Sequence, residues 1–150
     1  MPSMTLVDGT DLAAWANRRD AQEVLPQLLR RLVHATVGRV IRVGFPAGAG
    51  VQLGGWDGVV AAEQGNAFVP DGASAWELST NQDVKGKADG DYEKRRADPR
   101  EPAQGSYVFV TPRRWGRKDE WAVARRREGV WRDVRAYDAD DLEAWLDAGL

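Results

Sequence analysis

The chain has 150 residues, of which 43% are hydrophobic and 29% charged, a balance typical of one globular domain large enough to bury a core. It has no cysteine, which excludes disulfides and thiolate metal sites, and no apolar run near the roughly 18 residues of a membrane-spanning helix. The length predicts a single domain over residues 1–150. The opening residues lack the basic and apolar regions of a signal peptide, which, with the absence of cysteine, predicts a cytoplasmic protein.

The net charge of −2 conceals a strong asymmetry along the chain. Residues 85–135 carry fifteen Lys and Arg against nine Asp and Glu, whereas the remainder carries six against fourteen. A basic half on an acidic protein is typical of a surface that faces a polyanion. The simpler explanation, a solvated face with many salt bridges, stays open.

Two helices are expected at the N-terminal end. Thr10 can cap a short first helix over residues 11–18. Asp20 followed by Glu23 has the spacing of a capping box at the start of a second helix. Behind it, apolar or half-apolar residues recur at helical spacing: Leu25, Leu28, Leu29, Leu32, Val33 and Thr36.

Pro26 fits the first turn of a helix better than its interior, so we expect the regular second helix to begin near it and to end at Gly38. Three strands are expected next, over residues 39–46, 56–62 and 74–80, where β-branched and aromatic residues stand between turn residues. The glycine-rich stretch between the first two lacks the Gly-Lys-Ser/Thr ending of a P-loop, which argues against that class of phosphate site.

Helices and strands alternate in the rest of the chain. Residues 83–96 and 118–128 have helical patterns, whereas residues 106–112 form an apolar run typical of a strand buried on both faces. Residues 133–138 read as a further strand, and Asp138 opens a last helix. The first three strands can form a meander and the later ones need crossovers, so the expected fold class is α/β, with a mixed central sheet flanked by helices on both faces.

Two carboxylates stand out on neighbouring strands of the expected meander. Asp57 opens the second strand, and Glu77 lies between Trp76 and Leu78 in the third, where an unpaired carboxylate is costly. Neighbouring strands run about 5 Å apart, so in the right register both carboxylates point to one edge of the sheet and repel unless a cation lies between them. Mg²⁺ is the natural candidate, because it takes one or two carboxylates, keeps several waters and completes its shell with phosphate oxygens. The rival explanation is a buried Glu77 paired with an arginine such as Arg42.

An aspartate on one strand and an acidic motif on the next, within an αβββαβ order, resemble the PD-(D/E)xK nuclease superfamily, the fold of restriction endonucleases. The resemblance extends over nearly the whole chain through GWDGVV, VPDGASAWELST, KADGDYEKR, FVTPRRW and YDADDLEAWL. Together these stretches resemble the restriction-endonuclease-like domains at the N-terminus of bacterial STAND or NACHT-type ATPases linked to antiphage defence.

The resemblance implies a restriction-endonuclease-like αβββαβ core and a Mg²⁺- or Mn²⁺-dependent endonuclease that acts on DNA in antiphage defence. It implies that Asp57 and Glu77 hold the metal. It also implies activity as a dimer or larger assembly, and a STAND-type ATPase that is fused to the domain or associated with it. The alternative is a catalytically inactive module with the same fold that binds nucleic acid or a protein.

The superfamily pattern places a lysine two positions after the acidic residue, where it orients the attacking water and offsets charge on the phosphate. In this chain Ser79 stands there. The superfamily sometimes moves its lysine to the next helix, which makes Lys87 the first candidate and Lys85 the second, although both also suit an ordinary helix surface. Glu23 is either the extra metal-directed acid that some members carry or only a capping-box residue.

Candidate contacts to nucleic acid surround these residues, at the ends of the expected strands and of the polar helix. They are Gln52, Thr80, Lys94, Arg95, Arg113 and Arg114. Phosphate contacts from such side chains dominate affinity and make it salt-dependent. No element with base-reading character is evident, so we expect weak or no sequence specificity.

Overall fold

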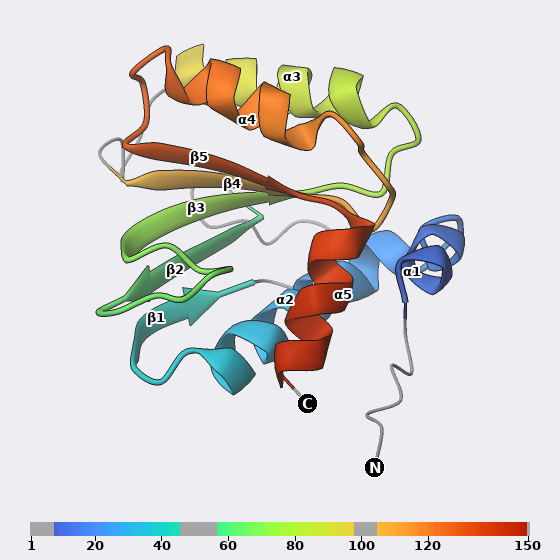
Figure 1. Cartoon of the computed structure of the whole chain (residues 1–150), viewed down its shortest axis with the longest axis horizontal. Coiled ribbons are helices and arrows are strands. Elements are labelled where there is room, and N and C mark those ends of the chain that lie inside the picture. Colours follow the sequence, from blue (N-terminus) through green and yellow to red (C-terminus); the bar gives the residue numbers. More distant parts are fainter. Residues whose placement is uncertain (1–7, 46–56, 98–104, 150) are drawn as a thin grey trace.

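A five-stranded mixed sheet lies between two layers of helices (Figure 1). The computed structural model describes residues 8–45, 57–97 and 105–149. The strands lie in chain order and are β1 (Val40–Gly44), β2 (Gly58–Ala62), β3 (Gly72–Leu78), β4 (Ser106–Val110) and β5 (Asp133–Tyr137). The first three pair antiparallel, whereas β3, β4 and β5 run parallel. The predicted α/β class, with a meander followed by crossovers, is therefore confirmed.

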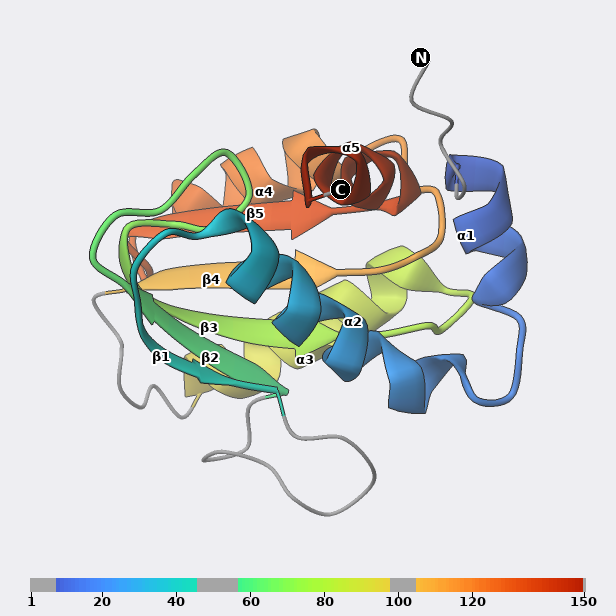
Figure 2. The same ribbon diagram turned by 90° about the horizontal axis from the view of Figure 1, so that it is seen from below.

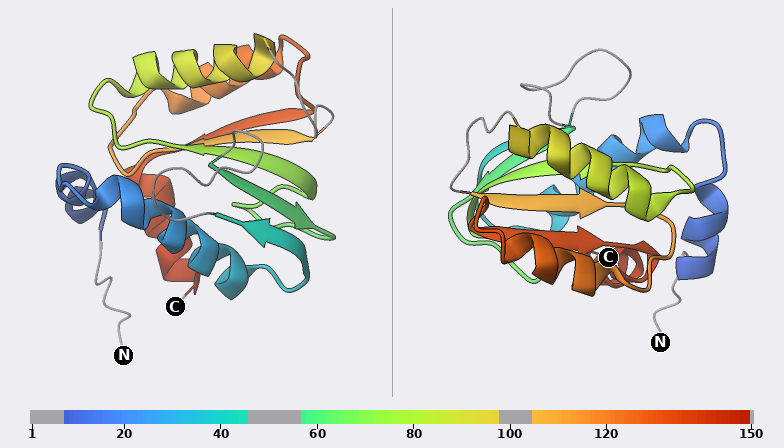
Figure 3. Two further views of the ribbon diagram at one scale, coloured as in Figure 1. Left: turned by 180° about the vertical axis from the view of Figure 1, so that it is seen from behind. Right: turned by 90° about the horizontal axis from the view of Figure 1, so that it is seen from above.

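The helices divide between the two faces of the sheet (Figures 1, 2 and 3). The crossover helices α3 (Val84–Ala97) and α4 (Lys118–Arg126) cover one face, because right-handed crossovers that advance in one direction return on the same side. The other face is covered by α2 (Ala21–Thr36) and α5 (Ala139–Gly149), with α1 (Gly9–Trp15) packed against α5. Within the described ranges, no helix is long and apolar enough to cross a membrane.

Each face of the sheet has its own core, because successive side chains of a strand point to opposite faces. Trp76 and Leu78 of β3 belong to the core under α2 and α5, where the Trp76 ring lies 6.0 Å from that of Trp145. Ala75 belongs to the core under α3 and α4. Glu77 has the parity of Ala75, so β3 presents this carboxylate to the α3 side of the sheet.

The first helix begins earlier than predicted. Asp8 caps α1, since its carboxylate accepts a hydrogen bond from the Asp11 N–H at 2.8 Å and Asp11 reciprocates at the Asp8 N–H. The predicted cap at Thr10 is wrong, and the helix ends at Trp15 rather than near Arg18. The reciprocal pair satisfies two backbone donors that a Thr10 cap would have left without a partner.

The second helix also differs from the prediction. α2 begins at Ala21, Asp20 makes no side-chain cap hydrogen bond, and Pro26 lies inside the helix. An interior proline costs about 3 kcal/mol because it removes one hydrogen bond and crowds the preceding turn. Burial of the apolar face of α2 against the sheet outweighs that cost, through Leu25, Leu29, Leu32 and Val33.

A hydrogen-bonded network ties α3 to α4 on the outer layer. The Arg125 guanidinium lies 4.5 Å from the centre of the Tyr92 ring and 2.9 Å from the Asp89 carboxylate. Asp89 also accepts hydrogen bonds from Trp121 Nε1 at 2.7 Å and from Lys85 Nζ at 2.8 Å. The Lys85 side chain therefore belongs to the network between α3 and α4.

This network predicts a pH-dependent stability. Burial raises the pKa of Asp89, but the hydrogen bonds from Lys85, Trp121 and Arg125 together outweigh it and leave this pKa below its ordinary value. A carboxyl whose pKa is lowered on folding stabilises the fold above its unfolded pKa, and the contribution disappears as pH falls through the folded pKa. Urea denaturation should therefore show Asp89→Asn less stable than wild type near pH 7, with the difference shrinking below about pH 4. A difference that stays constant over this range would contradict the assignment.

Candidate active site at the end of strand β3

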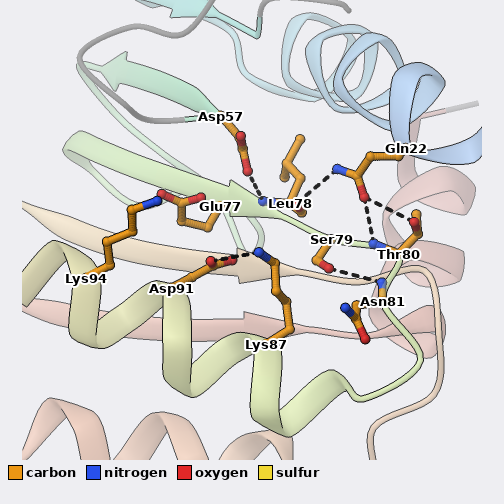
Figure 4. A pocket seen from close by; sticks show the side chains of 10 residues that line it. All are labelled: Gln22, Asp57, Glu77, Leu78, Ser79, Thr80, Asn81, Lys87, Asp91 and Lys94. Carbon is orange, nitrogen blue, oxygen red and sulfur yellow. Dashed lines mark hydrogen bonds and ion pairs between the residues drawn. The ribbon is translucent and has the colours of Figure 1, made fainter. Parts of the chain in front are cut away.

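A pocket of about 370 Å³ opens where the ends of β2 and β3 meet α2 and α3 (Figure 4). Its lining residues are Gln22, Asp57, Glu77, Leu78, Ser79, Thr80, Asn81, Lys87, Asp91 and Lys94. Five residues predicted from the sequence for catalysis, metal binding or nucleic-acid contact are among them: Asp57, Glu77, Thr80, Lys87 and Lys94. The fold therefore brings these five together.

The strand register sets the two carboxylates against each other. β2 and β3 pair antiparallel with Gly58 opposite Trp76, so one step further along the same register Asp57 stands opposite Glu77. Directly opposed residues of an antiparallel pair point to the same face. Both carboxylates therefore lie on the α3 side of the sheet, where the pocket opens.

The Asp57 carboxylate is held by the neighbouring strand. Its Oδ2 accepts a hydrogen bond from the Leu78 N–H at 2.8 Å, and its other oxygen has no partner in the part of the chain that the structure describes. A side chain at Gly58 would collide with the Phe45 ring, which explains the glycine beside this aspartate. Glu77 is only 4% exposed, so the pocket combines a half-buried and a buried carboxylate.

Helix α3 supplies the cationic side of the pocket. Lys87 Nζ lies 3.1 Å from Asp91 Oδ1, one helical turn further along, and the side chain of Asp91 is only 14% exposed. Lys94 lines the same pocket and extends from α3 toward Glu77 (Figure 4). Asp91 is thus a pocket residue.

Two other predicted residues lie outside the pocket. Lys85 points to the opposite side of α3, where it pairs with Asp89, because two positions along a helix turn a side chain by about 200°. Glu23 is exposed on α2 and does not line the pocket, whereas its neighbour Gln22 does. The capping-box function expected for Glu23 is absent too, since Asp20 forms no side-chain cap.

The rival partner proposed for Glu77 is distant from it. Arg42 is exposed on β1, and β2 separates this strand from β3. Arg42 pairs in register with Ala61, four positions along β2 from Asp57. The prediction that Glu77 pairs with Arg42 is therefore wrong.

Arg113 and Arg114 bind the protein itself. All three guanidinium nitrogens of Arg113 donate within the chain, to the Thr80 carbonyl at 2.7 Å, the Asn17 side chain and the Ala16 carbonyl. Arg114 donates to Thr10 and lies 3.7 Å from Asp140. Arg113 therefore links the end of β3 to the turn between α1 and α2 through hydrogen bonds, which is a structural role. Gln52 and the Arg95 side chain lie outside the described part of the chain.

Sequence reasoning missed Gln22. Its side-chain amide donates to the Leu78 carbonyl at 3.2 Å and accepts hydrogen bonds from the N–H of Thr80 at 2.9 Å and its hydroxyl at 3.0 Å. Gln22 thereby forms hydrogen bonds with the backbone of the residues on both sides of Ser79, just after β3 ends. The only signal in the sequence was a polar residue at the start of the long helix, which does not distinguish Gln22 from Glu23.

The donor chemistry of the pocket suits a small, hard cation. Among the described residues there is no group of three or more His, Cys, Asp or Glu side chains placed to hold a metal. Mg²⁺ needs only one or two protein carboxylates, because waters and substrate phosphate complete its shell. Asp57 and Glu77, with an Asp57 oxygen without a described partner, fit that requirement.

Comparison of the chain with protein-family models, with curated proteins and with solved structures yields no match.

Proposed function

We propose that this domain is a metal-dependent endonuclease that hydrolyses phosphodiester bonds in DNA, built on a restriction-endonuclease-like core. The observation that carries the proposal is the convergence of Asp57, Glu77 and Lys87 on one pocket. The element order α2-β1-β2-β3-α3-β4 agrees with the αβββαβ order that the resemblance implies, which supports the same conclusion.

The formal charges of the pocket support a need for a divalent cation. Three carboxylates, Asp57, Glu77 and Asp91, and two ammonium groups, Lys87 and Lys94, line the pocket. A phosphodiester is itself an anion and is repelled by these carboxylates. A divalent cation held by Asp57 and Glu77 would offset the repulsion between these carboxylates and the phosphate, and would thereby support substrate binding as well as chemistry.

Each pocket residue then has a role. Asp57 and Glu77 would hold Mg²⁺ or Mn²⁺, which supplies polarisation of the phosphate and a lowered pKa of bound water. The Leu78 N–H orients Asp57. Lys87 places positive charge where negative charge develops on the phosphate, which substitutes for the lysine that Ser79 replaces. Asp91 keeps the Lys87 ammonium in the pocket, and Lys94 adds a second cationic contact.

We further propose an effector role in antiphage defence, with a fused or associated STAND-type ATPase. Cutting both strands of a duplex needs two sites, so assembly of two or more domains would raise activity. The competing candidate is a catalytically inactive nuclease-fold module that binds nucleic acid or a protein, which Ser79 at the usual lysine position favours. It predicts binding without cleavage.

The test is cleavage of a supercoiled plasmid at high protein concentration, in Mg²⁺, in Mn²⁺ and in EDTA, with a structured RNA in parallel. Nicked or linear plasmid in either metal, and none in EDTA, is the expected result. Binding without cleavage in either metal would favour the inactive module. Cleavage of RNA alone would redirect the proposal to ribonuclease activity.

A further inference from the structure

The residue that replaces the expected lysine presents a proton to the pocket. Ser79 is only 4% exposed, and its hydroxyl oxygen accepts a hydrogen bond from the Asn81 N–H at 3.0 Å. A hydroxyl both accepts and donates. Among the residues that the structure describes, nothing accepts the Ser79 proton, so it remains available to a ligand.

Asn81 is arranged in the same way. Its side-chain oxygen accepts a hydrogen bond from the Asp83 N–H at 2.9 Å, which assigns the other end of the amide as the nitrogen. That NH₂ group has two donor hydrogens and no acceptor in the described ranges of the chain. Asn81 therefore also offers hydrogens to the pocket, while its oxygen holds the loop.

Thr80, which lies between Ser79 and Asn81, has no donor hydrogen left to offer. Its hydroxyl proton is donated to Gln22 Oε1 at 3.0 Å, and its backbone N–H is donated to the same oxygen. Only lone pairs of the Thr80 oxygen remain, which cannot bind a phosphate oxygen. While the Gln22 contact persists, the phosphate role expected for Thr80 falls instead to the residues on either side of it.

We infer that Ser79 and Asn81, together with Lys87, form a subsite for a non-bridging oxygen of the substrate phosphate. All three line the pocket, and Figure 4 shows their polar ends grouped at the end of β3. Two side chains with uncommitted donor hydrogens beside an ammonium group suit an acceptor such as phosphate. The pocket is thereby divided into a cation side at Asp57 and Glu77 and an anion side at Ser79 and Asn81. The inference rests on the proposed function.

The decisive variant is Asn81→Asp, which keeps the oxygen that accepts the Asp83 N–H but replaces the donor NH₂ by a second oxygen. Its matched control is Gln82→Glu, which adds the same charge at the next residue, exposed and without a hydrogen bond to any described residue. Ser79→Ala is the second variant, because it removes the other donor without adding charge. Thermal denaturation of each protein monitors folding.

Affinity is measured by fluorescence anisotropy with a labelled DNA duplex in Ca²⁺, a cation of similar ligand preference that here serves as a binding probe. Asn81→Asp is expected to weaken binding about 10-fold or more, as for loss of a hydrogen bond to a charged group. Ser79→Ala is expected to weaken it by about 3- to 10-fold, and Gln82→Glu by less than about 3-fold, as for one exposed charge.

Equal effects of Asn81→Asp and Gln82→Glu, or unchanged binding by Ser79→Ala, would overturn the subsite. Wild-type measurements separate this outcome from failure of the proposed function. If wild type cleaves plasmid and binds DNA in a cation-dependent way, only the subsite is at stake. If wild type neither cleaves nor responds to the cation, the proposed function fails, and the subsite with it.

Discussion

Asp57→Asn and Glu77→Gln should each lower Mg²⁺-dependent plasmid cleavage by about 10³-fold, because loss of a metal-binding carboxylate forfeits several kcal/mol of transition-state stabilisation. Amides are preferable to alanine here. The oxygen of Asn at position 57 can still accept the Leu78 N–H, and Gln preserves the volume of the buried Glu77. Cleavage is followed on agarose gels as the rate of supercoiled plasmid loss.

The control variant for this experiment is Glu63→Gln. Glu63 is an exposed carboxylate that pairs with Arg39 and lines a different pocket, so its loss should leave cleavage within about twofold of wild type. Mg²⁺ should also raise the unfolding temperature of wild type and of Glu63→Gln, but not of the two pocket variants, because a bound ligand stabilises the folded state. Na⁺ at matched ionic strength excludes a general salt effect.

Two outcomes would contradict the metal assignment. One is an active Asp57→Asn or Glu77→Gln protein. The other is an Mg²⁺-dependent rise in unfolding temperature that survives in both variants. If Glu77→Gln instead fails to fold, Asp57→Asn alone still decides, because Asp57 is half-buried and its hydrogen bond is retained by the amide.

Lys87→Ala should lower cleavage by about 10²- to 10³-fold, the usual cost of one group that stabilises transition-state charge. Adding Ser79→Lys to the Lys87→Ala variant should restore the cleavage rate by at least about 10-fold. Ser79 has the parity of Glu77 along the chain and lines the same pocket, so a lysine there starts from the position that the superfamily pattern uses. Single-turnover rates at saturating protein separate this loss of chemistry from a loss of binding.

The comparison variant is Lys85→Ala. Lys85 pairs with Asp89 and lines the pocket between α3 and α4, so cleavage should change little. The reverse ranking, with loss in Lys85→Ala and none in Lys87→Ala, would contradict the placement of the catalytic charge. Equal losses would indicate a general electrostatic contribution of α3. Thermal denaturation of Lys87→Ala checks that Asp91, deprived of its partner, does not unfold the helix.

Much of the fold could be predicted because its signals are local. Turn residues and hydrophobic periodicity, which depend on near neighbours, predict the three early strands and the later alternation of helix and strand. The same order placed Asp57 and Glu77 on adjacent strands. Errors appeared where two local signals competed, as at Thr10 and Asp8, or where distant packing outweighed a local preference, as at Pro26.

The α/β class and the placement of Asp57 and Glu77 on adjacent strands could be predicted from local patterns, whereas the register that sets the two carboxylates opposite each other comes from the pairing of β2 with β3. The tertiary structure places Lys87 at the pocket and Lys85 beside Asp89, because α3 packs through Tyr92 against Tyr107 of β4 and Trp121 of α4. It likewise turned Arg113 inward and brought Gln22 to the end of β3. These contacts join residues far apart along the chain, and no local pattern encodes them.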